Sequence, residues 1–448
     1  MPYLYPLLLI GGLLLASPAQ ALPEAVDKPL PLQQRGQVID TLLQQRLETL
    51  APQLMRKHNI DMWILVSREY NEDPVLRTML PSSWISARRR TILVLSDRGI
   101  HDGIDRGVEA LAVARYDVGD VFKKAWNPEQ QPDQWARLAE LVREHNPERI
   151  GVNQSADFAQ ADGLVATDKE ELLAALDETY RSRIVSAEPL AVGWLETRIE
   201  AELPYYRHAV KIAHELIAEA FSNQVVEPGK TSTAEVEWWL REQAAALNLD
   251  VWFHPSVTVQ RQGDLAGNPR AQVDAILPGD LLHVDFGITY LRLNTDTQQQ
   301  AYVLRPNETD VPAYLSQALA AGNQVQNILT DQFKAGRTGN EILLSALAEA
   351  HEQGLQPSIY THPIGYYGHG SGPTIGMWDK QAAIEGAGEY PLYDQTAYSI
   401  ELNTTVAGTE WGQDLMIMLE EDAIFWNGEI DYLNGRQTEL HVIRATAE

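Results

Sequence analysis

The sequence predicts two domains: an α/β domain, followed by an α+β domain built from two duplicated halves. Three observations support this prediction. The chain has 448 residues, which is more than a single hydrophobic core usually serves. In its first part, short apolar runs alternate with helical segments. In its second part, a pattern of capping box, helix and aromatic–x–His–Pro run occurs twice.

The first domain is predicted to span residues 22–187. Residues 62–66 and 91–96 are short apolar runs of the kind found in buried strands. Because such runs alternate with helical segments, we expect a mixed sheet covered by helices. The residues of this domain contain no recognisable catalytic constellation. The predicted helical segments are an amphipathic stretch at 41–58 and two segments at 132–145 and 169–176.

The second domain is predicted to span residues 188–448, with the boundary near residues 185–195. It is expected to contain a long helix that begins at the run Glu202-Leu-Pro-Tyr and ends near residue 223. Trp238 and Trp239 lie on the next predicted helix, and we interpret them as packing residues rather than as a platform for a ligand.

An internal repeat predicts that the second domain is pseudo-symmetric. Each unit opens with a capping-box pattern, Ser232-x-x-Glu235 in the first and Thr338-x-x-Glu341 in the second. Each predicted helix is then followed by an aromatic–x–His–Pro run. The glycines that precede the two capping boxes are 107 residues apart, and the two histidines are 108 apart. Two equivalent helix-then-strand units indicate duplicated halves.

The chain is strongly acidic, with a formal charge of −27 from 35 Lys and Arg against 62 Asp and Glu. Such a chain repels phosphate backbones and anionic lipid surfaces, so we expect neither nucleic acid nor a stable membrane association. Most of this charge is interpreted as a solvated surface, but cationic ligands such as metal ions also suit it. There is no cysteine, so any metal site must use His, Asp and Glu.

Residues 1–21 are predicted to be a signal peptide that is removed on export. The apolar run at 7–16 is too short to span a bilayer, which needs roughly 20 apolar residues. It is followed by Ala19-Gln20-Ala21, a small-x-small cleavage site. We therefore expect a periplasmic or secreted protein. An uncleaved anchor is the alternative, because residues 1–6 contain no Lys or Arg.

The segment around Asp285 carries the strongest functional signal. A largely apolar run at 281–284 precedes Asp285, and a turn-like stretch at 290–294 leads to Asp296. This pattern predicts a β-hairpin that brings the two aspartates side by side on adjacent strands. Facing carboxylates repel unless a cation lies between them, and a carboxylate within an apolar strand needs a proton, a partner or a metal.

Four more residues extend this signal. Glu401 and Glu420 lie within apolar strand-like runs, while His362 and His369 lie seven residues apart in a glycine-rich segment. The four carboxylates and one imidazole are enough for two cations that share bridging carboxylates, roughly 3.5–4 Å apart. Hard oxygen donors dominate and sulfur is absent. Mn²⁺ therefore fits best, with Zn²⁺ and Co²⁺ as alternatives.

This pattern resembles the pita-bread metallopeptidases, which include aminopeptidase P, prolidase, methionine aminopeptidase and the metal-free relative creatinase. The run His362-x-x-Gly365-x-x-x-His369 is similar to the family's segment around its metal-binding histidine. The N-terminal domain resembles the creatinase/prolidase N-terminal domain, which points to the proline-specific branch. The five residues whose order carries the resemblance are Asp285, Asp296, His362, Glu401 and Glu420.

The resemblance implies a pita-bread catalytic domain and a role for each metal ligand. Asp285 would chelate one metal ion. Asp296 and Glu420 would bridge the two ions. His362 and Glu401 would complete the second site.

The resemblance also implies two catalytic residues. Glu401 would shuttle protons, and His369 would face the substrate and stabilise the developing negative charge. In an alternative register, His369 would be the metal ligand in place of His362, because it follows Gly368 where the family commonly has a glycine before that ligand.

Three positions depart from the family pattern. Asn268, seventeen residues before Asp285, stands where proline-specific members commonly have a substrate-binding histidine. Thr361 replaces a common glycine before the metal-binding histidine, and Met418 replaces an arginine often found two residues before the last metal-binding glutamate. These departures affect the expected substrate specificity more than the expected metal binding.

Together these features predict an Xaa-Pro peptidase that acts on short proline-containing peptides, and the resemblance implies a homodimer. A metal pair would lower the pKa of a bridging water, and the resulting hydroxide would attack the bond preceding proline. Two alternatives stay open. One is a hydrolase of a different C–N bond. The other is a catalytically silent pita-bread protein that captures peptides.

Overall fold

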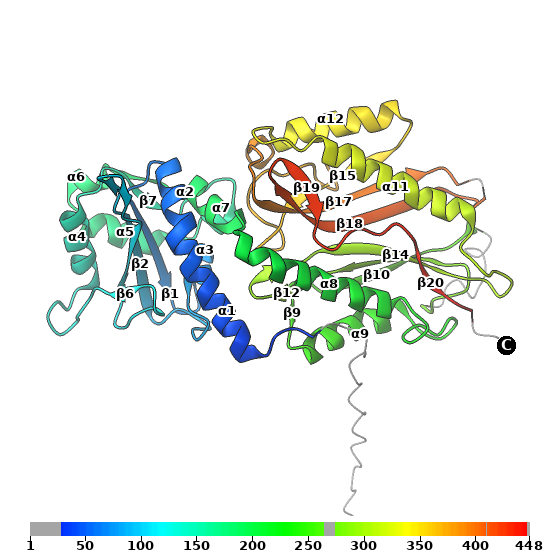
Figure 1. Cartoon of the computed structure of the whole chain (residues 1–448), viewed down its shortest axis with the longest axis horizontal. Coiled ribbons are helices and arrows are strands. Elements are labelled where there is room, and N and C mark those ends of the chain that lie inside the picture. The colour runs from blue at the N-terminus through cyan, green and yellow to red at the C-terminus, as the bar shows by residue number, and fades with distance from the viewer. Residues whose placement is uncertain (1–27, 264–273, 409, 446–448) are drawn as a thin grey trace, which may run out of the picture.

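The structure is a computed structural model that describes residues 28–263, 274–408 and 410–445. The predicted signal peptide at 1–21 and Asn268 lie outside these residues. Two units with separate sheets follow one another along the chain (Figure 1). Among the described residues, no helix has both the length and the apolar character needed to cross a membrane.

The N-terminal unit contains a six-stranded sheet in the order β6-β5-β2-β1-β7-β8. The central strand β1 pairs antiparallel with β2 and parallel with β7. The predicted mixed sheet is therefore confirmed. Its strands are β1 (Met62–Arg68), β2 (Arg90–Asp97), β5 (Val108–Val113), β6 (Lys123–Lys124), β7 (Ile150–Val152) and β8 (Ile184–Ser186), beside a small ribbon of β3 (Ile100–His101) and β4 (Ile104–Asp105).

Both faces of this sheet are buried, because successive residues of a strand point to opposite sides. On β1, Trp63 and Leu65 pack into one hydrophobic cluster, while Met62 and Ile64 pack into another. Helices supply the other half of each cluster. These are α1 (Leu32–Gln45), α2 (Ala51–Lys57), α3 (Pro74–Met79) and α7 (Glu188–Glu196) on one side, and α4 (Gln134–His145) and α5 (Ala166–Ala175) on the other, with the short α6 (Glu178–Arg181) beside them.

The helix expected at 41–58 begins earlier, at Leu32, and contains a π-helical segment at Arg46–Leu50. Pro52 explains the interruption, because it has no N–H to donate to the preceding turn. Arg46 in this segment is fully buried. It pairs with Glu202 at 3.0 Å and donates to the backbone oxygen of Thr197, at the start of the C-terminal unit.

The connection between the units runs through α7, whose side chains pack with the N-terminal unit. The predicted boundary between residues 187 and 188 remains a prediction. The expected long helix follows as α8 (Leu203–Ala220).

The C-terminal unit contains a nine-stranded sheet whose main path is β10-β11-β14-β18-β17-β15. The strands of this path are β10 (Ser256–Gln260), β11 (Leu281–Phe286), β14 (Thr297–Val303), β15 (Pro357–Ile359), β17 (Thr396–Val406) and β18 (Leu415–Trp426). The strands β16 (His362–Pro363), β19 (Glu429–Tyr432) and β20 (His441–Ile443) pair beside this path, and β9 (Asp250–Val251), β12 (Ile288–Tyr290) and β13 (Leu293–Asn294) form a separate small sheet.

Two helix pairs cover this sheet and confirm the duplicated halves. The pair α8 and α9 (Thr233–Ala246) packs on β11 and β14, while α11 (Ala313–Asp331) and α12 (Gly339–Glu352) pack on β17 and β18. Figure 1 shows the two pairs on opposite sides of the curled strands. Both predicted capping boxes are present, at the start of α9 and at the start of α12.

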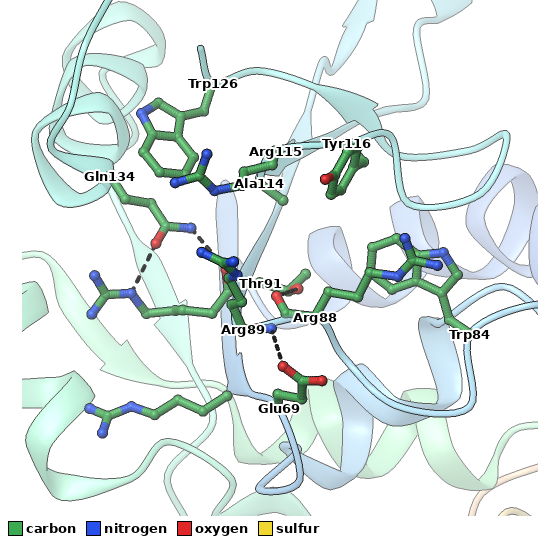
Figure 2. A pocket seen from close by; sticks show the side chains of 12 residues that line it. Glu69, Trp84, Arg88, Arg89, Thr91, Ala114, Arg115, Tyr116, Trp126 and Gln134 are labelled. Atoms are coloured by element: carbon green, nitrogen blue, oxygen red, sulfur yellow. Dashed lines mark hydrogen bonds between the residues drawn. The ribbon is translucent and has the colours of Figure 1, made fainter. Parts of the chain in front are cut away.

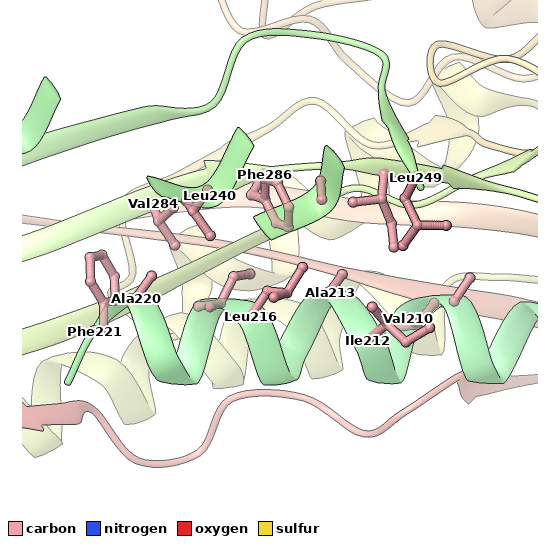
Figure 3. Close-up of a cluster of buried hydrophobic side chains, with 14 of the residues drawn as sticks. Val210, Ile212, Ala213, Leu216, Ala220, Phe221, Leu240, Leu249, Val284 and Phe286 are labelled. Carbon is pink, nitrogen blue, oxygen red and sulfur yellow. The ribbon is translucent and has the colours of Figure 1, made fainter. Parts of the chain in front are cut away.

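The core under α8 shows how the sheet acquires two different faces. Val210, Ala213 and Leu216, spaced three residues apart, lie on one side of the helix and pack toward Val284 and Phe286 of β11 (Figure 3). The alternate residues of β11 must then point to the opposite face of the sheet. That inner face carries the polar residues of the candidate site.

Candidate metal centre

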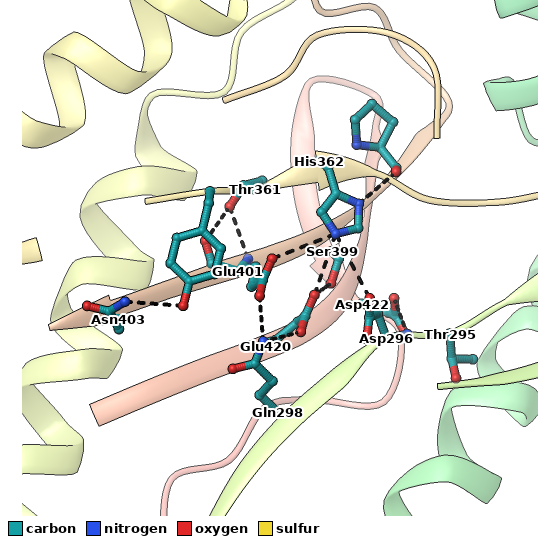
Figure 4. Close-up of polar contacts among 12 residues, drawn as sticks. Thr295, Asp296, Gln298, Thr361, His362, Ser399, Glu401, Asn403, Glu420 and Asp422 are labelled. Carbon is teal, nitrogen blue, oxygen red and sulfur yellow. Dashed lines mark hydrogen bonds and ion pairs between the residues drawn. The ribbon is translucent and has the colours of Figure 1, made fainter. Parts of the chain in front are cut away.

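Five predicted ligands come together on the inner face of the C-terminal sheet. Asp285 lies on β11, His362 on β16, Glu401 on β17 and Glu420 on β18, while Asp296 immediately precedes β14. Figure 4 shows four of them pointing toward one another from these strands. Glu401 and Glu420 are direct cross-strand partners. Like charges at such positions are unfavourable without a cation between them.

Three overlapping groups of side chains have donor atoms within 4.8 Å of one another. His362 Nε2 lies 3.7 Å from a Glu420 oxygen, 3.8 Å from Glu401 and 4.0 Å from Asp296. These distances exceed a hydrogen bond but suit atoms that surround a common ion. The groups are Asp285, Asp296 and Glu420; His362, Glu401 and Glu420; and Asp296, His362 and His369.

Three of the donor atoms are buried and lack a hydrogen-bond partner. Asp285 Oδ1, Asp296 Oδ1 and His362 Nε2 make no hydrogen bond. Burial, and then the charge of Glu420, raise the pKa of Asp285 to about 8 and hold the pKa of Asp296 and of Glu401 well above the ordinary range. Buried unpaired carboxylates need protons or cations. The donor set therefore fits divalent metal ions.

A ring of hydrogen bonds holds two of the carboxylates from behind. The side-chain amide of Gln298 donates to Glu401 Oε1 at 2.5 Å and to Glu420 Oε2 at 2.6 Å. The Ser399 hydroxyl donates to the other Glu420 oxygen at 2.6 Å. Asp422 accepts from the backbone N–H of Asp296 at 3.1 Å (Figure 4). None of these supporting residues was among the predicted site residues.

A buried histidine fixes the orientation of Gln298. His283 Nε2 lies 2.7 Å from Gln298 Oε1, and burial lowers the pKa of His283 to about 4, so its ring is neutral. Its Nδ1 faces the Thr258 hydroxyl at 3.2 Å. The amide nitrogen of Gln298 faces two carboxylates, so its oxygen must accept, and His283 must donate from Nε2. His283 lies two residues before Asp285, on the same strand face, and strand periodicity could have found it.

His362 is oriented as a ligand by the backbone of the next residue. Its Nδ1 lies 3.0 Å from the carbonyl oxygen of Pro363, so Nδ1–H donates there and Nε2 keeps a lone pair toward the carboxylates. His369 is exposed, and its ring lies edge-on to those of His362 and Trp252, with centroids 4.8 and 5.3 Å away. A side chain on Gly368 would collide with the Trp252 ring. Here glycine serves close packing within the protein.

The hairpin prediction requires a correction. Across from Asp285 the structure places Gln298 rather than Asp296. The chain leaves β11 at Gly287, where any side chain would clash with the backbone oxygen of Thr295, and forms the separate hairpin β12–β13 before β14 begins. Asp296 therefore reaches the site from the position just before β14, where the chain rejoins the sheet. The two carboxylates are close, as expected, but they are not paired across strands.

The structure describes two of the three positions that depart from the family pattern. The Thr361 hydroxyl donates to the backbone oxygen of Glu401 and accepts from its N–H, both at 3.0 Å, so the larger residue ties its segment to β17. Met418 is half-buried on β18, two residues before Glu420 and on the same strand face. Asn268 lies outside the described residues.

The curled, duplicated sheet and the carboxylate-rich cluster at its centre define the pita-bread metallopeptidase class. Residues 204–424 match Metallopeptidase family M24. The C-terminal domain therefore belongs to this family, whose peptidases use divalent metals, and the predictions of the fold and of a peptidase are confirmed. No curated protein matches the chain in sequence.

Solved structures of three peptidases share the fold of nearly the whole chain. An X-Pro aminopeptidase from Thermotoga maritima is 16% identical, with a TM-score of 0.61, and the match covers 87% of this chain and 99% of that one. An Xaa-Pro dipeptidase from Bacillus anthracis is 16% identical (TM-score 0.56; 92% and 100% covered). A dipeptidase from Mycobacterium ulcerans is 19% identical (TM-score 0.58; 91% and 99% covered).

Proposed function

We propose that the protein is an Xaa-Pro peptidase that uses two divalent metal ions. The observation that carries the proposal is the convergence of five buried or half-buried donors, three of which have atoms without a partner: Asp285, Asp296, His362, Glu401 and Glu420. The similarity in fold to an X-Pro aminopeptidase and an Xaa-Pro dipeptidase supports the specificity for proline.

The proposed count of two ions is supported by overlapping donor groups. Asp285, Asp296 and Glu420 form one group, and His362, Glu401 and Glu420 form another, so Glu420 is positioned to serve both. Oxygen donors outnumber nitrogen donors, which favours Mn²⁺ over Zn²⁺ or Co²⁺. When bound, such ions would activate water and polarise the scissile carbonyl.

The protein's own residues would then handle protons and charge. Glu401 borders the cluster and, as a carboxylate, would accept a proton from the attacking water and return it to the leaving nitrogen. His369 is exposed beside the cluster and would donate to the oxyanion. Its loop is held by Gln160 of the N-terminal unit, which donates to the His369 backbone oxygen at 2.7 Å. The surrounding carboxylates would also attract the free α-amino group of a peptide.

A substrate panel tests the proposal. Xaa-Pro dipeptides, Xaa-Pro-Yaa tripeptides and matched peptides with alanine in place of proline would be incubated with the protein and Mn²⁺. We expect release of the N-terminal residue from the proline peptides alone. Cleavage of the alanine peptides at an equal rate would contradict the specificity. Absence of both turnover and tightly held metal would instead support a silent peptide-binding protein.

Export and dimerisation complete the proposal. The short apolar run and Ala19-Gln20-Ala21 support removal of residues 1–21. Mass spectrometry of protein recovered from its native host is expected to find Leu22 as the N-terminus, and an intact Met1 would contradict export by this route. Light scattering at several protein concentrations would test the proposed homodimer.

A further inference from the structure

A second concentration of charge lies in the N-terminal unit, away from the carboxylate centre in the fold. A cavity of about 750 Å³ opens where β1 and β5 end and β2 begins (Figure 2). This volume is within the range of small-molecule sites. We call it the arginine pocket. Its lining residues are Arg68, Glu69, Trp84, Arg88, Arg89, Arg90, Thr91, Ala114, Arg115, Tyr116, Trp126 and Gln134.

Two of the five arginines are neutralised by carboxylates behind the pocket. Arg68 pairs with Asp168 at 2.8 Å, and Arg90 pairs with Glu171. In the part of the chain that the structure describes, the other three lining arginines form no ion pair. The one acidic residue of the lining, Glu69, offsets one of them. The pocket therefore keeps a formal surplus of two positive charges in a chain whose net charge is −27.

Aromatic rings hold two of the unpaired guanidinium groups at the wall. The Arg88 guanidinium lies 4.6 Å from the ring centre of Trp84 and 5.8 Å from that of Tyr116. The Arg115 guanidinium lies 5.6 Å from the ring of Trp126. A guanidinium stacked on a ring keeps its N–H groups directed outward in its own plane. These donors remain available to a ligand.

The backbone between β1 and β2 spreads three consecutive arginines around the pocket. Arg89 adopts a left-handed conformation with φ of 53°, which costs about 1–2 kcal/mol for a residue with a side chain. Its N–H donates to the Glu69 carboxylate at 3.1 Å and holds this conformation in place. Its neighbours then diverge, with Arg88 on Trp84 and Arg90 over Trp135 at 4.7 Å.

Some arginines elsewhere in the same unit have carboxylate partners. Arg98 pairs with Glu109 at 3.1 Å, Arg137 with Glu144 at 2.8 Å, and Arg143 with Asp177 at 3.2 Å. Others, such as Arg77 and Arg149, form no ion pair among the described residues, so what distinguishes the pocket is that its unpaired arginines line one cavity. Three unpaired arginines around one concavity, two of them stacked on aromatic rings, form an arrangement suited to an anion from outside the chain.

We propose that the arginine pocket binds a small multivalent oxyanion, one carrying at least two phosphate or carboxylate groups. Planar guanidinium groups bind both kinds of oxyanion through paired hydrogen bonds. The surplus of two charges and the separation of Arg88 from Arg115 on different loops favour a ligand with two charged ends over a single monovalent anion. The proposal does not depend on the peptidase assignment, because no residue of the metal centre takes part.

Calorimetric titration of the full-length, metal-loaded protein tests this inference. Pyrophosphate and citrate are the probes that separate phosphate from carboxylate ligands, and chloride is the monovalent control. The double variant Arg88→Gln/Arg115→Gln removes the stacked guanidinium groups. Arg98→Gln is the matched control, because it removes one arginine of the same unit outside the pocket. Because both probes also chelate divalent metal ions, each titration is repeated on the metal-free protein, whose carboxylate centre repels anions.

We expect at least one probe to bind the wild-type protein, and the double variant to bind it at least tenfold more weakly. Arg98→Gln is expected to stay within twofold of wild type, and thermal melting of each variant checks its folding. Equal binding by the double variant, or binding of neither probe, would overturn the inference. So would a salt-sensitive dimer lost in the double variant without probe binding, because the pocket would then serve an acidic protein surface.

Discussion

The molecule contains two clusters of like charge, and the repulsion between like charges is reduced differently in each. In the arginine pocket, two guanidinium groups are stacked on separate aromatic rings and exposed to solvent. In the metal centre, carboxylates are buried between strands, and burial is the first cause of their raised pKa. Water screens the first cluster, whereas the second needs protons or cations to exist.

This difference separates the charged groups that need a bound ion from those that do not. The arginines are exposed to solvent, so an anion at their pocket would be optional for the fold. The buried carboxylates share too few donors, since Gln298 and Ser399 satisfy Glu420 and Glu401 only in part. Changes at the two clusters should therefore have unequal effects, and the experiments below test that inequality.

The largest effect is expected when a bridging or chelating charge is removed. Asp285→Asn or Glu420→Gln should abolish peptide hydrolysis and reduce the metal content, because the ions lose a ligand charge. The chain should stay folded, because repulsion within the centre falls. Activity, elemental analysis and circular dichroism measure these outcomes. Asp414→Asn, an exposed acid just before β18, is the control. Wild-type turnover in either variant would refute the di-metal assignment.

The next effect separates the two histidines. His362→Ala should lose metal and nearly all activity together, because its Nε2 faces the carboxylates. His369→Ala should keep its metal while turnover falls by roughly 10²–10³-fold, as when one oxyanion donor is removed. Metal content is counted beside the kinetics of each variant. If His369→Ala is the variant that loses metal, the alternative register is correct.

A smaller effect is expected from a change at Gln298, whose amide donates to two of the proposed ligands. Gln298→Ala should weaken metal affinity about 10–100-fold, the range for residues that orient metal ligands. Gln299→Ala removes the neighbouring glutamine, which faces Glu421 on the other side of β14, and should leave metal affinity unchanged. Competition with a fluorescent chelator measures both. Equal affinities would show that the hydrogen bonds from Gln298 do not position Glu401 and Glu420.

The smallest effect is a pH dependence of the metal-free protein. The pKa of Asp285 is about 8 in the folded state, against about 4 for an ordinary carboxyl group in an unfolded chain. Between these values the folded state binds more protons, so its stability should fall as pH rises. After chelation, the melting temperature should drop from pH 5 to pH 8, and by less in Asp285→Asn. An equal drop in the two proteins would exclude Asp285 as its source.

Much of the fold follows from local patterns. The capping boxes at Ser232 and Thr338, and the apolar run at 62–66, depend on neighbours a few residues away, and the structure contains these elements as expected. The π-helical segment before Pro52 was not predicted, because a helical hydrophobic pattern does not show which hydrogen bonds the backbone makes.

Prediction of the site was partial for a related reason. Acidic residues within apolar strands stand out in sequence, which is how Asp285, Glu401 and Glu420 were found. Gln298 and Ser399 are ordinary polar residues until the strand register brings them beside a ligand. The arginine pocket was missed because residues 88–90 resemble a solvated charge run, and only the pairing of β2 with β5 brings Arg115 near them.

The seam between the duplicated halves has a consequence for how the protein matures. β14 and β18 meet there in register only at Gln298 and Glu420 among the described residues, and donors come from both sides, Asp285 from one half and Glu401 from the other. Neither half alone contains a complete donor set. We therefore expect metal capture during refolding to lag behind helix formation and to report the moment at which the halves dock.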